Sequence, residues 1–200
     1  MIAGLVLAGG ESRRMGHDKA LISIYGKPAF YHAAELLKNF CETVFVSCRE
    51  NQDLMSNLVE QPTWLKEVFD HQEFADKGPL SGLLSCLEHM GIDQNETLSS
   101  EIPFDGLLVL GCDYRNMKEY THTDILAVGL MQQKICCYKN PNTQIIDPLV
   151  AYYPMLILQH LPAFAETQSS LRAFIEQQPH HYLIPTSEQL AALRSFDFPI

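Results

Sequence analysis

The sequence predicts a single α/β domain with a mixed, mostly parallel β-sheet, and three observations support this. Apolar, β-branched runs alternate with helical patterns along the chain. A turn with hairpin chemistry, KNPNTQ at 139–144, separates two late apolar runs, so part of the sheet is expected to be antiparallel. The 200 residues are enough for one sizeable core, and no repeat or low-complexity linker divides them. We therefore expect residues 1–200 to form one domain.

The first half of the chain holds three of the expected strands and two helices. IAGLVLA at 2–8 is an apolar run that predicts a buried strand ending at a glycine-rich turn. Residues 28–39 place apolar side chains on one helical face, with a proline in the first turn. Residues 43–48 are β-branched and apolar, and EVFD at 67–70 is a shorter run, so both predict strands. A Gly-Pro pair then marks the start of a helix over 79–90.

The second half continues the alternation. Residues 91–104 are polar and acidic, which is typical of an exposed loop. DGLLVLG at 105–111 predicts a strand, and the runs at 135–138 and 145–153 predict the two arms of the hairpin. The chain ends with a strand–helix pair, which is preceded by two short helices at 153–161 and 169–178.

Composition and charge exclude several classes of protein. The net charge is -10 and the isoelectric point is about 5.2, which argues against a general nucleic-acid binder because phosphate backbones require a basic face. No apolar run approaches the roughly 20 residues of a membrane span. The opening segment lacks the basic start of a signal sequence. We expect a cytoplasmic protein without nucleic-acid or membrane partners.

The spacing of the cysteines and histidines does not indicate a zinc site. The six cysteines form no C-x-x-C pair and lie mostly in apolar runs, so buried reduced thiols are expected. The eight histidines are scattered and show no H-x-x-x-H spacing, which favours surface or interfacial positions. A G-x-S-x-G nucleophile signature is also absent from the sequence.

The opening stretch LAGGESRRMGHDKALI, residues 7–22, gathers Arg13, Arg14 and Lys19 behind two glycines in a chain of negative net charge. It is neither G-x-G-x-x-G nor a Walker loop. Glycines let main-chain N–H groups approach phosphate oxygens, while arginine and lysine supply planar and compact cationic donors. These residue types suit a triphosphate. The alternative is an ordinary glycine turn followed by solvent-exposed arginines.

Two carboxylates are candidates for the same site. Asp70 and Asp113 each follow the end of a predicted strand, as the glycine turn does. Ligands of α/β folds bind beyond the carboxyl ends of the strands, so these groups are expected to converge on one edge of the sheet. The alternatives are a helix-capping role for Asp113 and a turn-forming role for Asp70.

The pattern L-A-G-G-x-S-x-R-M-G-x-D-K-A-L resembles, position for position, the signature of the molybdenum cofactor guanylyltransferases. The later matches fall in the family's order: Gly26-Lys27-Pro28, Gly78-Pro79-Leu80-Ser81-Gly82, Cys112-Asp113, Asp147-Pro148-Leu149-Val150-Ala151 and Ser169-Ser170-Leu171-Arg172. The resemblance covers essentially the whole chain. It implies a three-layer α/β/α Rossmann-like nucleotidyltransferase fold with a mostly parallel mixed sheet.

The resemblance also implies a reaction and its participants. GMP is transferred from GTP to the molybdopterin-bound molybdenum cofactor, which a carrier protein delivers, and pyrophosphate is released with the help of Mg²⁺. The implied catalytic residues are Arg14, Lys19 and Asp113, with Asp113 also binding the metal; Arg13 matches a variable position. The implied nucleotide-binding residues are Leu7, Ala8, Gly9, Gly10, Lys19, Asp70, Gly78, Pro79, Leu80, Gly82 and Asp113.

The sequence departs from the family pattern in three places. The usual C-D-x-P is Cys112-Asp113-Tyr114-Arg115 here, and the loss of the proline is expected to free the loop beside the metal ligand. Ser47 replaces an asparagine near the nucleotide. Residues 183–190 lack both asparagines of N-x-N-T-P-E-D-L but keep a Thr-x-Glu helix cap.

Two alternatives to the guanylyltransferase therefore stay open. One is a sister nucleotidyltransferase that uses CTP or another phosphorylated acceptor, although such relatives usually read L-A-A-G and lack G-P-L-x-G. The other is a nucleotide-binding member of the family that has lost catalysis.

Overall fold

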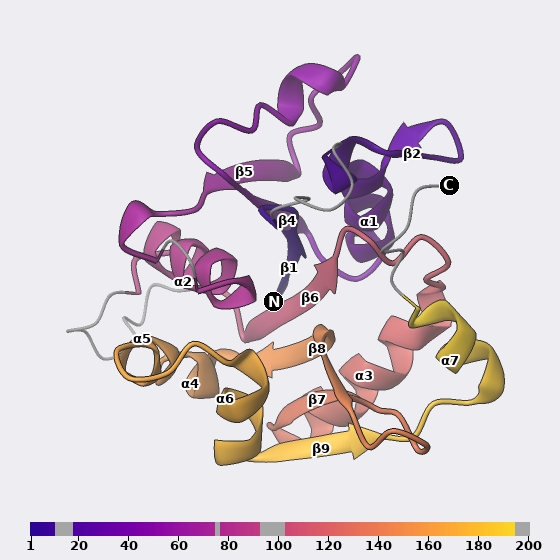
Figure 1. Cartoon of the computed structure of the whole chain (residues 1–200), viewed down its shortest axis with the longest axis vertical. Coiled ribbons are helices and arrows are strands. Elements are labelled where there is room, and N and C mark those ends of the chain that lie inside the picture. Colours follow the sequence, from indigo (N-terminus) through magenta and orange to yellow (C-terminus); the bar gives the residue numbers. More distant parts are fainter. Residues whose placement is uncertain (11–17, 75–76, 93–102, 195–200) are drawn as a thin grey trace.

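The computed structural model describes residues 1–10, 18–74, 77–92 and 103–194. Its centre is a seven-stranded sheet with the strand order β5-β4-β1-β6-β8-β7-β9 (Figure 1). The strands are β1 (Ile2–Leu7), β4 (Thr43–Cys48), β5 (Leu65–Phe69), β6 (Gly106–Gly111), β7 (Ile135–Lys139), β8 (Ile146–Pro154) and β9 (His180–Leu183).

The sheet is mixed, with one reversed strand. β8 pairs antiparallel with β6 and with β7, whereas the pairs β1–β4, β1–β6, β4–β5 and β7–β9 are parallel. The predicted hairpin is confirmed: Asn140 accepts backbone N–H bonds from Asn142 and Thr143 through its side-chain oxygen, which closes the turn between β7 and β8. The predicted mostly parallel mixed sheet is therefore correct.

Helices cover both faces of the sheet. The α-helices are α1 (Ala29–Lys38), α2 (Pro79–His89), α3 (Glu119–Gln132), α4 (Met155–Leu158), α5 (Leu161–Ala165), α6 (Leu171–Gln177) and α7 (Ser187–Ala192). Shorter elements are the 3-10 turns η1 (Lys19–Leu21), η2 (Met55–Asn57) and η3 (Gln72–Phe74), and a hairpin of β2 (Ser23–Ile24) and β3 (Lys27–Pro28).

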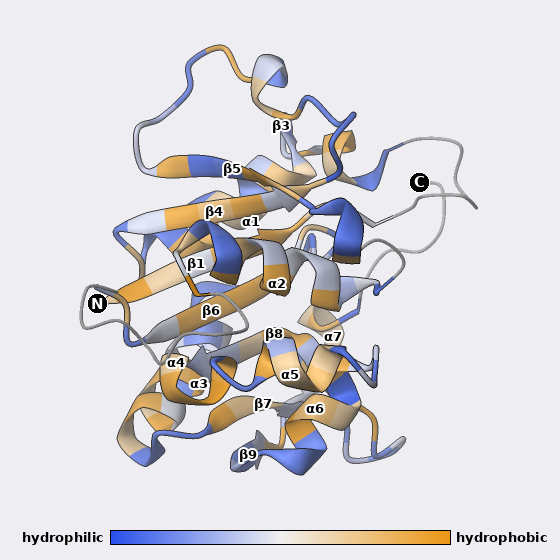
Figure 2. Cartoon of the chain, turned by 90° about the vertical axis from the view of Figure 1, so that its left-hand side faces the viewer, coloured by the Kyte–Doolittle hydropathy of each residue, from blue (hydrophilic) through white to orange (hydrophobic). Residues whose placement is uncertain are grey.

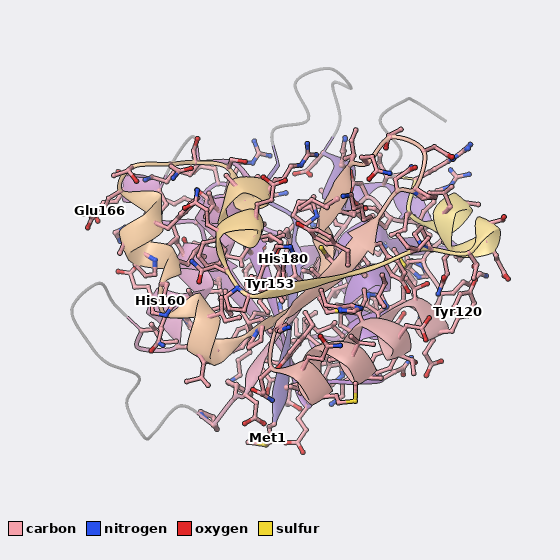
Figure 3. All side chains as sticks on the ribbon, turned by 90° about the horizontal axis from the view of Figure 1, so that it is seen from below. Met1, Tyr120, Tyr153, His160, Glu166 and His180 are labelled. Atoms are coloured by element: carbon pink, nitrogen blue, oxygen red, sulfur yellow. The ribbon has the colours of Figure 1, made fainter. Side chains whose placement is uncertain are left out.

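Two apolar clusters define the layers. One joins α2, α4, α5 and α6 to one face of the sheet, and the other joins α1 and α3 to the opposite face. Seen from below, β9 runs between α3 and the layer of α4 to α6 (Figure 3). Of the strands between these layers, β4 and β6 are coloured mainly hydrophobic (Figure 2). The three-layer α/β/α arrangement predicted from the resemblance is confirmed.

Several boundaries differ from the predictions. β5 begins at Leu65 rather than at 67. The single helix predicted over 153–161 is two short helices, because β8 continues to Pro154 and Pro162 lies in the first turn of α5, where it lacks the N–H that a continuous helix needs. The loop predicted at 91–104 falls largely outside the described residues. The cap of α7 pairs Thr186 with Gln189 in a capping box, rather than with the expected glutamate.

Helix α3 was not predicted, and its composition explains why. Its buried side is made of Thr121, His122, Ile125, Leu126 and Gly129, so polar and small residues interrupt the apolar period that predicts a helix. His122 is fully buried and lies against Phe40, with ring centroids 5.9 Å apart. The prediction of surface or interfacial histidines is therefore wrong for His122.

All six cysteines are buried, as predicted, and burial raises the pKa of the Cys41 thiol to about 12.

The burial of His122 predicts a pH dependence of stability. Burial lowers the pKa of His122 from 6.5 to about 4, so between these values the unfolded chain binds a proton that the folded chain does not. Stability is therefore lost as the pH falls. Relative to a His122→Phe variant, we expect the wild-type free energy of unfolding to drop by up to about 3 kcal/mol between pH 7 and pH 4. Urea unfolding of both proteins at several pH values measures this, and parallel pH profiles would contradict it.

In the part of the chain that the structure describes, no helix combines the length and the apolar character needed to cross a membrane.

Candidate active site

A pocket of about 750 Å³ opens where the parallel strands β1, β4, β5 and β6 end. The residues that line it come from the last residues of these strands, from the segments directly after them, and from the starts of η1 and α2; Leu149 of β8 completes the wall. They are Leu7, Ala8, Gly9, Gly10, Lys19, Ser47, Arg49, Glu50, Asn51, Asp70, His71, Gln72, Gly78, Pro79, Ser81, Gly82, Gly111, Cys112, Asp113 and Leu149. The glycine turn, Asp70 and Asp113 thus meet at one edge of the sheet.

The glycine turn packs directly on Asp70. The Ala8 N–H donates to the Ser47 carbonyl at 2.9 Å, which extends the β1–β4 ladder into the turn. A methyl group added at Gly9 would collide with Oδ2 of Asp70, whereas one added at Gly10 would meet nothing within 4 Å. The two adjacent glycines therefore have different steric roles.

This difference gives a prediction for a matched pair of variants. Gly9→Ala is expected to displace the Asp70 carboxylate and to weaken nucleotide binding about tenfold or more, because overpacking typically costs 1–3 kcal/mol. Gly10→Ala leaves Asp70 in place and is expected to keep wild-type thermal stability. Calorimetry of nucleotide binding and thermal melts compare the two, and equal binding losses would contradict the steric difference.

Asp70 is held by its neighbours. The Ser47 hydroxyl donates to Asp70 Oδ1 at 2.5 Å, and the Asp70 N–H donates to the Cys48 carbonyl at 2.7 Å. Burial raises the pKa of Asp70, while the Ser47 hydrogen bond and the positive charge of Arg49 oppose this rise. Ser47, at the position where the resemblance implies an asparagine, therefore orients a carboxylate of the pocket.

Lys19 and Asp113 lie side by side in the pocket. The Lys19 Nζ is 3.7 Å from Asp113 Oδ2, and their side chains are 23% and 19% exposed. Asp18 begins η1 by accepting the Ala20 N–H through Oδ1 at 3.0 Å, and this sets the chain direction at Lys19. The arrangement puts the lysine charge of η1 and the carboxylate that follows β6 within reach of one ligand.

The remaining predicted site residues divide into three groups. Arg14 and Arg13 lie outside the described residues. Gly78 and Pro79 line the pocket, and Gly78 has a φ of +57°, which favours glycine. Leu80, in contrast, is fully buried in the hydrophobic core, because the second residue of α2 faces the sheet. Leu80, which was predicted to bind the nucleotide, therefore does not line the pocket.

Gly82 allows a close approach, but between elements of the protein itself. A methyl group there would collide with the Ser47 hydroxyl and with Leu7. The glycine thus lets α2 lie directly against the ends of β1 and β4. Gly82 also lines the pocket, so this packing role comes in addition to its predicted place at the nucleotide.

Comparison with known proteins identifies the family. Residues 4–182 match the MobA-like NTP transferase domain. The chain belongs to this family.

Relatives of the MobA-like domain agree with this assignment. The chain is 33% identical over 156 residues to a molybdenum cofactor biosynthesis bifunctional protein of Synechocystis sp., which covers 78% of the chain and 40% of that protein. It is also 33% identical over 85 residues to a molybdenum cofactor guanylyltransferase of Pseudomonas entomophila, which covers 42% of the chain and 41% of that protein. The matches thus span less than half the length of these relatives.

A solved structure shares the fold of this MobA-like domain. Molybdopterin-guanine dinucleotide biosynthesis protein A from Archaeoglobus fulgidus superposes with a TM-score of 0.72 at 18% identity, and the match covers 98% of the chain and 93% of that structure. At this identity the likeness shows the fold alone.

The loop after Asp113 is tied down in this MobA-like domain, contrary to the prediction that loss of the proline frees it. Tyr114 is buried, and its hydroxyl donates to Asp147 Oδ1 at 2.8 Å. The Leu149 N–H donates to the same oxygen at 3.2 Å. Burial raises the pKa of Asp147 to about 6, more than these hydrogen bonds lower it. The buried tyrosine thus anchors this loop, although Arg115 stands at the position of the proline.

Sequence reasoning missed part of the pocket wall. Arg49, Glu50, Asn51, His71 and Gln72 line the pocket although no motif includes them. Each follows the end of β4 or β5 by a few residues, so the rule that ligands bind beyond the carboxyl ends of strands could have indicated them. Gln52, which no motif includes, is buried and is hydrogen-bonded to Ala8 and Arg49 of this wall.

Proposed function

We propose that this MobA-like domain is a magnesium-dependent guanylyltransferase that transfers GMP from GTP to the molybdopterin-bound molybdenum cofactor and releases pyrophosphate. The observation that carries the proposal is the meeting of the glycine turn, Lys19 and Asp113 in one pocket of a MobA-like domain. The names of the relatives from Synechocystis and Pseudomonas entomophila support the choice of substrate.

The reaction that we propose is a displacement at phosphorus. The terminal phosphate of the molybdopterin attacks the α-phosphorus of GTP, a new P–O bond forms, and the bond to the β-phosphate breaks to release pyrophosphate. Catalysis of this step depends on positioning and on charge neutralisation. Main-chain N–H groups at Gly9 and Gly10 would donate to phosphate oxygens, whereas the Ala8 N–H is already bonded to the Ser47 carbonyl. Lys19 places a positive charge beside them, and Arg14, outside the described residues, would add another.

The residues present fit a magnesium ion. Among the described residues no group of three or more His, Cys, Asp or Glu side chains could hold a metal, and Asp113 is the carboxylate that lines the pocket beside Lys19. A single carboxylate suits Mg²⁺, which keeps several waters and takes further oxygens from phosphates. When bound, the ion would offset negative charge on the triphosphate and the leaving pyrophosphate. Asp70, fixed by Ser47, would contact the nucleoside.

The test combines binding and turnover. Purified protein is titrated with Mg-GTP, Mg-CTP and Mg-ATP in thermal melts, where a ligand at about 100 times its dissociation constant stabilises by roughly 2.7 kcal/mol. Pyrophosphate release is then measured with Mg-GTP and molybdopterin-loaded carrier protein. We expect stabilisation by GTP and release of one pyrophosphate per cofactor converted.

The other outcomes identify the alternatives. Preference for CTP would indicate a sister nucleotidyltransferase with a different acceptor. Tight GTP binding without pyrophosphate release would indicate a member that has lost catalysis. Absence of binding to all three nucleotides would overturn the proposal.

A further inference from the structure

A buried glutamine joins two positions of the opening signature, one before its glycine pair and one before Lys19. Gln52 is 6% exposed and lies in the segment after β4. Its Nε2 donates to the Ala8 carbonyl at 3.1 Å and to Asp18 Oδ2 at 2.7 Å, and its Oε1 accepts the Arg49 N–H at 3.0 Å. Ala8 precedes the first glycine and Asp18 precedes Lys19, so a single amide connects both to the end of β4.

The amide has one compatible orientation. Both partners of Nε2 are oxygen acceptors, and the partner of Oε1 is an N–H donor. Turning the amide over would place its oxygen against a carbonyl and a carboxylate. Because the side chain is buried, each of these lost bonds would leave an unsatisfied polar group. Neither glutamate nor methionine can replace this donor and acceptor set.

Asp18 transmits the effect of Gln52 to the pocket. Its Oδ1 accepts the Ala20 N–H, while its Oδ2 accepts from Gln52 and lies 3.4 Å from the Arg49 guanidinium. Both oxygens are thus engaged with the protein, and the position of Asp18 determines where the next residue starts. That residue is Lys19, whose Nζ lies 3.7 Å from Asp113.

We propose that Gln52 is a positioning residue for the triphosphate site. Through its bond to Asp18 it keeps Lys19 beside Asp113, and through its bond to Ala8 it fixes this lysine relative to the end of β1. This inference rests on the proposed function in one respect, namely that the pocket binds a nucleoside triphosphate. Gln52 does not itself line the pocket, and its effect on catalysis passes through the lysine and the glycine turn.

The principal test is Gln52→Glu, which keeps the size of the side chain and the bond from the Arg49 N–H but places an oxygen against Ala8 O and Asp18 Oδ2. We expect the dissociation constant and the KM of Mg-GTP to rise about 10- to 100-fold, the range for losing hydrogen bonds to a charged group. Gln52→Met, which removes the bonds without repulsion, is expected to raise both about three- to tenfold and keeps the test possible if the glutamate variant does not fold.

Gln189→Glu is the matched control. Gln189 is 5% exposed, donates to Asp124 Oδ2 at 2.8 Å and accepts the Thr186 N–H at 2.9 Å, so it repeats the chemistry of Gln52 outside the pocket wall. The two glutamate variants are expected to lower the melting temperature by similar amounts. Only Gln52→Glu is expected to change the KM of GTP, which separates positioning from general stability.

A swap of donor and acceptor tests the route through Asp18. In Gln52→Glu combined with Asp18→Asn, the new amide can donate to the new carboxylate while its oxygen still accepts the Ala20 N–H. We expect the double variant to bind Mg-GTP about fivefold or more tightly than Gln52→Glu alone. Such a recovery is expected when two neighbouring side chains interact directly.

The outcomes distinguish this inference from the proposed function. If the wild type binds Mg-GTP but both Gln52 variants bind it equally tightly with unchanged KM, the positioning role is overturned. The same holds if the losses of Gln52→Glu and Asp18→Asn simply multiply. If the wild type itself binds no nucleoside triphosphate, the proposed function fails instead.

Discussion

Asp113→Asn is expected to reduce the rate of pyrophosphate release from Mg-GTP about 1,000-fold, the largest effect of any single substitution in the described pocket. Asparagine keeps the shape of the side chain but removes its negative charge, so it would no longer hold the metal or pair with Lys19, whose Nζ is 3.7 Å away. The carboxylate lies at the end of β6 in the wall of the pocket, where partial burial strengthens its electrostatic effect. Steady-state assays over a range of Mg²⁺ concentrations measure the loss.

Asp105→Asn provides the control at the opposite end of the same strand. Asp105 immediately precedes β6, is exposed and pairs with the N-terminal amine at 2.6 Å. The whole length of β6 separates Asp105 from the pocket wall, so we expect its substitution to leave the rate of pyrophosphate release unchanged. If Asp113→Asn keeps more than about a tenth of the wild-type rate, the role of Asp113 as the metal ligand is wrong.

Lys19→Met is expected to lower kcat/KM for GTP about 100-fold. A hydrogen bond to a charged group contributes about 1.5–3 kcal/mol, which corresponds to roughly 10- to 150-fold. Methionine keeps much of the length and apolar stem of lysine but cannot neutralise a phosphate. Because Lys19 pairs with Asp113, the double variant with Asp113→Asn is expected to lose less than the product of the two single losses.

Lys27→Met is the corresponding control for Lys19. Lys27 belongs to the Gly26-Lys27-Pro28 match, but it is exposed and its Nζ lies 2.7 Å from Glu35, outside the pocket wall. Its kinetics are expected to equal those of the wild type. Equal kcat/KM values for Lys19→Met and wild type would contradict a role for Lys19 at the phosphates.

The architecture could be predicted from the sequence because local patterns carry it. Apolar β-branched runs predicted β1, β4, β6 and the β7–β8 hairpin near their observed bounds, and the resemblance implied the three layers. Helix α3 could not be predicted in this way. Its buried face contains Thr121 and His122, and whether such residues are buried depends on the strands that pack against them.

Part of the candidate site could also be predicted from local sequence patterns. Gly9, Asp70, Lys19 and Asp113 stand next to strand ends or in the glycine signature, so their convergence follows from the topology of a parallel sheet. Leu80, predicted with the nucleotide-binding residues, does not line the pocket, because a motif records spacing along the chain, whereas the rotation of α2 decides which of its residues face the core.

By itself, the sequence determined the α/β class, the family signature and the types of residue that could bind a triphosphate, since these depend on composition and on short-range order. Only the tertiary structure decided which side chains support one another: Ser47 with Asp70, Tyr114 with Asp147, and Gln52 with Ala8 and Asp18. These pairs join residues that are 23 to 44 positions apart in the chain. Their hydrogen bonds exist only after the sheet has brought the strand ends together, and no local pattern in the chain encodes that proximity.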